Sequence, residues 1–131
     1  MNTLLAIAPL LMVGLFLFIT FVFSIGEKLA DWKGTVSFYT QHFNGTFIAK
    51  IIPASLIMVL LMEFITVVLF LIGFYDLYQL TGFTYILLAL TSCAITLLVL
   101  LMGQRFAKDY QGAMSLGVYF IITVLGLIVI P

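Results

Sequence analysis

The sequence predicts an all-α integral membrane protein: a single transmembrane domain over residues 1–131, folded as an antiparallel four-helix bundle with an interfacial amphipathic helix between spans 1 and 2. Three observations predict this fold. First, 65% of the 131 residues are hydrophobic and 8% are charged, whereas soluble domains carry about 25% charged residues. Second, four apolar runs have the ~20 residues that a helix needs to cross a ~30 Å hydrocarbon core. Third, these runs lack the alternating polarity of a lipid-facing β-barrel.

We place the spans at residues 4–25, 52–74, 82–103 and 112–130. Their orientation follows from the basic residues, which all lie in two of the connections: Lys28, Lys33 and Lys50 between spans 1 and 2, and Arg105 and Lys108 between spans 3 and 4. Cytoplasmic loops are enriched in Lys and Arg. We therefore expect both basic loops in the cytoplasm and both termini outside, in a bacterial inner membrane.

The connection between spans 1 and 2, residues 27–50, carries apolar side chains spaced by three or four residues: Leu29, Trp32, Val36, Tyr39, Phe43 and Phe47. This spacing forms one face of a helix and predicts a cytoplasmic amphipathic helix lying in the headgroup region. A second interpretation stays open. The segment would be a lid over a quinone or lipid-like ligand, with Lys28, Trp32, Tyr39, His42 and Phe43 as its candidate residues. His42 would then be its one side chain that titrates near neutral pH.

Glu63 is the acidic residue within span 2, close to the middle of an apolar run. An acidic residue at the centre of a bilayer costs about 2.5–3.5 kcal/mol, so its presence needs a reason. We expect no basic residue to reach it, because the cytoplasmic lysines and Arg105 lie roughly 15 Å away along the helix. The expected form is a neutral, hydrogen-bonded acid. Its role stays open between a polar contact that joins helices, a hydrogen bond or proton exchange with a quinone, and proton-coupled transport.

Spans 3 and 4 carry small and polar residues at helical spacing. With Thr66, one turn from Glu63, they supply the candidate intramembrane polar residues: Ser92 and Thr96 in span 3, and Ser115, Tyr119 and Thr123 in span 4. Small residues and hydroxyls commonly serve helix packing in membranes. If the four helices form one bundle, the same residues are expected to surround Glu63 with hydroxyl groups.

Composition excludes several function classes. A net charge of zero gives no basic surface for nucleic acid. The single cysteine, Cys93, cannot form an intramolecular disulfide or a thiol relay within the chain. The sequence shows no His and Cys cluster that predicts a metal site. Catalytic residues cannot be named from the sequence.

Several short motifs carry a family resemblance: Gly26-Glu27-Lys28-Leu29 at the end of span 1, Trp32, Pro53 opening span 2, Glu63 within it, Leu71-Ile72-Gly73 closing it, and the stretch 103–113. Through these residues the chain resembles the DoxX family of small four-helix membrane proteins. The resemblance implies an accessory membrane subunit of a quinone-linked redox system, with Glu63 and the Gly26–Leu29 segment as the family-like polar positions. No flavin, haem or iron–sulfur site is evident in the chain, so a partner subunit or a bound quinone would carry the electrons.

Two further functions stay open from the sequence. One is a small proton-coupled transporter, because small multidrug exporters also have four spans and one membrane glutamate. In those exporters, however, the glutamate belongs to the first span. The other is a non-catalytic assembly or anchoring subunit of a membrane complex, for which lipid-facing helices and an interfacial segment suffice.

Overall fold

The computed structural model describes residues 2–131, which form five α-helices and one short 3-10 helix. The helices are α1 (Asn2–Ala30), α2 (Trp32–His42), η1 (Phe47–Ile51), α3 (Ile52–Gln79), α4 (Thr84–Phe106) and α5 (Tyr110–Ile128). The described residues contain no strand. The all-helical class predicted from the sequence is therefore confirmed.

Four helical segments are long and apolar enough to cross a membrane: Leu5–Ala30, Phe47–Gln79, Thr84–Phe106 and Tyr110–Ile128. Only 11% to 33% of the most apolar window of each segment is buried within the protein. Most residues of each segment are thus not buried, and their apolar side chains form a surface suited to contact with lipid. The chain is an integral membrane protein.

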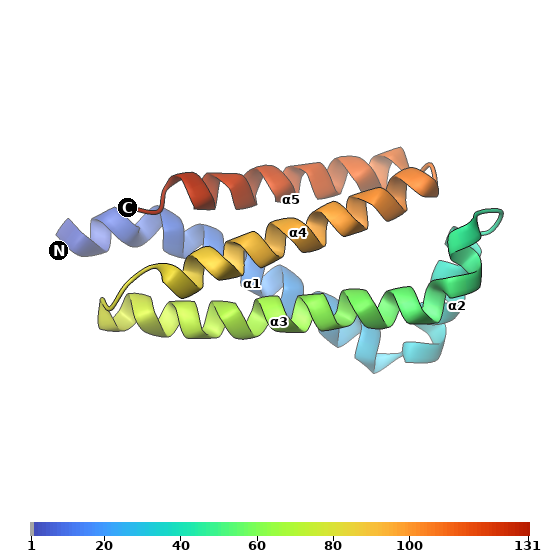
Figure 1. The fold of residues 1–131 in the computed structure, drawn as a ribbon, viewed down its shortest axis with the longest axis horizontal. Coiled ribbons are helices and arrows are strands. Elements are labelled where there is room, and N and C mark those ends of the chain that lie inside the picture. The colour runs from blue at the N-terminus through green and yellow to red at the C-terminus, as the bar shows by residue number, and fades with distance from the viewer. Residues whose placement is uncertain (1) are drawn as a thin grey trace.

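The long helices lie along one axis, and the two chain ends lie at the same end of the molecule (Figure 1). The most extensive contacts join α3 to α4 and α4 to α5, while α1 packs against both α3 and α5. Leu10 and Leu17 of α1 and Phe70 of α3 are completely buried in the main core cluster. Gly73 lets α3 approach α4 closely, because a Cβ at this position would lie 2.9 Å from the backbone of Ile86.

The helices run further than the predicted spans. α1 continues to Ala30 although the apolar run ends at Ile25, and α3 continues to Gln79. Helical hydrogen bonds do not require apolar side chains, so a helix can extend through the polar residues at a membrane surface. Asp31 separates α1 from α2, and its Oδ1 accepts a hydrogen bond from the Gly34 backbone N–H at 3.0 Å, which caps α2.

The connection between α1 and α3 differs from the single amphipathic helix that the spacing predicts. α2 ends at His42, and a turn with Gly45 at a φ of +87° separates it from η1. The predicted apolar face is not carried by one helix, because Leu29 lies in α1 and Phe47 in η1, where each is 63% exposed. Its central side chains instead pack against the first turns of α3, in a second core cluster formed around Phe43, Ile52 and Leu56. α2 therefore directs its apolar face at the protein and covers one end of the long helices.

Candidate functional site

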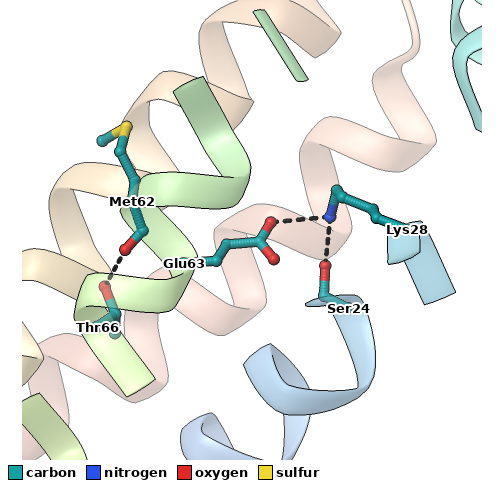
Figure 2. A network of polar contacts seen from close by, with 5 residues as sticks. All are labelled: Ser24, Lys28, Met62, Glu63 and Thr66. Atoms are coloured by element: carbon teal, nitrogen blue, oxygen red, sulfur yellow. Dashed lines mark hydrogen bonds and ion pairs between the residues drawn. The ribbon is translucent and has the colours of Figure 1, made fainter. Parts of the chain in front are cut away.

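The candidate site is centred on a buried ion pair between α1 and α3. Lys28 Nζ lies 2.9 Å from Glu63 Oε1, and the side chains are 10% and 2% exposed. Lys28 Nζ also donates a hydrogen bond to Ser24 Oγ at 2.6 Å. Figure 2 shows the ammonium between Ser24 on its own helix and Glu63 on the neighbouring one.

The direction of side chains on a helix explains how Lys28 reaches Glu63. Side chains of an α-helix point back toward its N-terminus. Lys28 lies in the last turn of α1, so its long side chain extends back along the helix past Ser24, one turn earlier. The expectation that no basic residue reaches Glu63 is therefore wrong. In place of the expected hydroxyl partners, Glu63 has the Lys28 amino group as its hydrogen-bond partner.

The second carboxylate oxygen of Glu63, Oε2, is buried and has no hydrogen-bond partner among residues 2–131. A buried acceptor without a partner typically costs about 1–3 kcal/mol, and more when it is charged. Lys28 also keeps a spare donor, because an ammonium has three N–H groups and only two are bonded to the described residues. The pair thus has one hydrogen-bond donor, on Lys28, and one acceptor, on Glu63, that the described residues do not use.

A cavity of about 470 Å³ adjoins this pair. Its wall includes Lys28 of α1, Tyr39 of α2 and Phe43 directly after it, Ser55, Val59 and Glu63 of α3, Gly103 and Gln104 of α4, and Leu116 of α5. The remaining lining residues are mainly apolar, and several of them lie on the outer surface of the helices, among them Met58, Met102 and Phe106. The volume falls in the range of small-molecule sites, about 300–1,000 Å³. An apolar ligand with a polar end matches such a cavity.

Tyr39 places a phenol on the wall of the same cavity. Burial raises the pKa of Tyr39 above its ordinary value, and the negative charges of Glu63 and Glu27 raise it further. The side chain therefore keeps its proton over a wider pH range than an exposed tyrosine. It is a stable hydroxyl at the cavity wall.

His42 does not line the cavity but fastens α2 to the turn between α4 and α5. Its Nε2 lies 3.0 Å from Gln104 Oε1 and 3.4 Å from Asp109 Oδ2. Gln104 itself lines the cavity, while Asp109 caps α5 by accepting a hydrogen bond from the Gly112 N–H. Of the other lid candidates, Lys28, Tyr39 and Phe43 line the cavity. Trp32 does not line it and packs in the core cluster around Phe43.

The predicted ring of hydroxyls around Glu63 is not formed by the described residues. Thr66 Oγ1 and Ser92 Oγ lie 2.6 Å apart and join α3 to α4. Thr96 and Thr123 are buried and donate to carbonyls one turn earlier on their own helices. Ser115 is exposed, and Tyr119 packs its ring 6.1 Å from that of Phe16. These residues serve helix packing, which was the alternative interpretation of the small and polar pattern.

Sequence reasoning did not identify Ser24, Ser55 or Gln104 as parts of the site, nor Asp109 as the partner of His42. One signal was available for the first of these. Ser24 and Lys28 are four residues apart, which places both side chains on one helix face. The cavity-lining residues of α4 carried no such signal, because their neighbours on other helices cannot be read from one chain segment.

Comparison with protein-family models, with curated proteins and with solved structures found no match in any of the three.

Proposed function

We propose that this protein is a DoxX-like accessory subunit of a quinone-linked redox system, and that it holds a lipid-soluble quinone in the cavity beside Lys28 and Glu63. The four long helices would cross a bacterial inner membrane as an antiparallel bundle, with both termini outside and both basic loops in the cytoplasm. In this arrangement the apolar quinone tail would lie toward the lipid, and its polar ring would lie against the ion pair.

One observation carries this proposal: an unpartnered buried carboxylate oxygen and a spare ammonium N–H occur together at the wall of an apolar cavity. Membrane proteins rarely bury charged groups without a functional reason. Quinones combine an apolar tail with a headgroup that forms hydrogen bonds, so the residues present fit this class of ligand. Exposed apolar residues of the lining, including Met58 and Met102, would let such a ligand enter sideways from the lipid.

When bound, a quinone would supply electron transfer, which no residue of this chain supplies by itself. The chain would bind and orient the headgroup through Lys28 and Glu63 and exclude water by means of α2. Because electrons must come from elsewhere, we propose a partner protein in the same membrane. The basic loops and the surface of α2 are the parts that would face a cytoplasmic partner.

The test is to purify the protein from its native membrane in mild detergent and to identify by mass spectrometry the lipids and proteins that remain bound. We expect a quinone at a substantial fraction of one per chain, together with a redox partner. Gly103→Leu should displace the quinone by filling the cavity. Gly103→Ala should not, because the added Cβ would lie 3.5 Å from the Phe43 ring, an ordinary contact.

Recovery of the wild-type protein without a quinone, followed by failure to take one up in reconstituted membranes, would refute the binding proposal. Recovery with a quinone but without a partner protein would support the quinone-binding site and refute the role as an accessory subunit. Proton-driven substrate uptake by vesicles that contain this protein alone would instead establish transport.

A further inference from the structure

The ion pair leaves one donor and one acceptor without partners among the described residues, and both of its residues line the cavity. Lys28 Nζ donates to Ser24 Oγ and to Glu63 Oε1, which leaves the third N–H of the ammonium. Glu63 Oε2 accepts no hydrogen bond from the described residues. Oε1 and Oε2 belong to one carboxylate, so the free acceptor is adjacent to the ammonium that already contacts this group. A ligand atom that reaches this carboxylate from the cavity would therefore lie beside the ammonium as well.

A hydroxyl is the ligand group that satisfies both positions at once. Its O–H donates to the carboxylate, and its oxygen accepts from the ammonium. A carbonyl can only accept, so it would use the Lys28 N–H and leave Glu63 Oε2 buried without a partner. An ammonium or amine headgroup would donate to Glu63 but would meet the positive charge of Lys28. Since an unpaired buried acceptor is costly, the site discriminates between these groups.

Aromatic side chains near the pair favour a ring-shaped headgroup. The rings of Tyr39 and Phe43 both line the cavity, with their centroids 6.5 Å apart and an angle of 28° between their planes. Flat aromatic walls suit an aromatic ligand, which can stack on them or pack edge to face. A diacylglycerol also carries a hydroxyl but has no ring. The aromatic walls therefore favour a hydroquinone over a diacylglycerol as the source of the hydroxyl.

We infer that the cavity binds the reduced, hydroquinone form of the lipid-soluble quinone more tightly than the oxidised form. One hydroquinone hydroxyl donates to Glu63 Oε2 and accepts from Lys28 Nζ. This inference rests on the proposed function and adds the redox state of its ligand. A hydrogen bond to a charged group corresponds to about 10- to 100-fold in affinity. A tenfold preference for the reduced form raises the two-electron midpoint potential of the bound couple by about 30 mV.

The test measures both redox forms on the intact protein in lipid nanodiscs. Isothermal titration under argon compares a short-chain benzoquinone with its hydroquinone, and diacylglycerol serves as the hydroxyl-bearing lipid without a ring. We expect the hydroquinone to bind at least about tenfold more tightly than the quinone, and diacylglycerol to bind more weakly than the hydroquinone. A spectroelectrochemical titration of the bound couple should show a potential above that of the free couple.

The variant Glu63→Gln should reduce the selectivity toward unity, because a glutamine amide can donate to a carbonyl as well as accept from a hydroxyl. Asp76→Asn makes the same chemical change near the far end of α3 and should keep the full selectivity. The wild-type comparison of redox forms needs no variant, so it decides the matter even if Glu63→Gln does not fold.

Equal affinity for the two redox forms, or tighter binding of the quinone, would overturn this inference while leaving the proposed function intact. Binding of neither form would overturn both. Tighter binding of diacylglycerol than of hydroquinone would also overturn both, and would make the cavity a site for neutral lipids.

Discussion

Replacing Lys28 by methionine should strongly destabilise the protein, because it leaves the Glu63 carboxylate buried without its cation. The Glu63 side chain is 2% exposed, and its one hydrogen bond among the described residues is the 2.9 Å contact with Lys28. Removal of one partner from a buried ion pair costs about 3–5 kcal/mol. Methionine keeps most of the length and apolar volume of the lysine stem, so the change removes charge more than packing.

The double variant Lys28→Met, Glu63→Gln should be more stable than Lys28→Met alone. It buries a neutral amide in place of an unpaired carboxylate, and a neutral polar group costs much less to bury. We expect the two substitutions to be non-additive by about 2 kcal/mol, within the range found for directly contacting residues. Lys33→Met is the matched control, because Lys33 is an exposed lysine of α2, and it should change stability by less than about 0.5 kcal/mol.

The assay is reversible unfolding in mixed detergent micelles, followed by circular dichroism as the fraction of denaturing detergent rises. The free energies of the four proteins in the cycle then give the coupling directly. A cost below about 1 kcal/mol for Lys28→Met would show that the pair is not a buried, coupled unit. Additive costs would refute the reasoning equally, even if each single variant were unstable.

Three further predictions follow from the geometry. Burial and the charges of Glu63 and Glu27 raise the pKa of Tyr39 above its ordinary value, so its contribution to stability is complete below the pKa of an unfolded tyrosine, about 10, and is lost as the pH rises through the raised pKa. Tyr39→Phe should remove this alkaline loss of stability, measured by thermal unfolding against pH, and an unchanged profile would contradict it. His42→Ala should detach α2 from the α4–α5 turn, so amide hydrogen exchange in residues 32–42 should be faster than in the wild-type protein, while exchange in the middle of α3 stays slow. An unchanged exchange rate in residues 32–42 would count against this contact. Gly73→Ala should destabilise by about 1–3 kcal/mol because its Cβ would lie 2.9 Å from the Ile86 backbone, whereas Gly117→Ala, with nothing within 4 Å, should be neutral or stabilising; equal effects of the two on detergent unfolding would refute the close approach.

The long helices were predictable because their signal is local. A run of about 20 apolar residues has few structures open to it in a bilayer, and the four runs did form helices. Glu63 could be singled out for the same reason, since a carboxylate in such a run stands out by itself. Neither inference required knowledge of which segments are neighbours in space.

The partner of Glu63 was not predictable by the same reasoning. The predicted span ends at Ile25, where polar residues begin, but the helix hydrogen bonds continue to Ala30. This placed Lys28 in an aqueous loop, whereas it belongs to a helix whose geometry turns its side chain back toward the membrane. The predicted hydroxyl ring around Glu63 is absent for a related reason: Thr96 and Thr123 donate to carbonyls one turn earlier on their own helices, so these donors are not directed at Glu63.

The cavity lies at one end of the long helices, among the first turns of α3, the last turns of α4 and the covering helix α2. With the helices across a bilayer, its mouth is level with only one of the two lipid leaflets. A lipid-soluble molecule in the opposite leaflet would first have to flip across the membrane to enter. The position of one cavity thus makes the protein directional, and any chemistry that it supports would be vectorial with respect to the membrane.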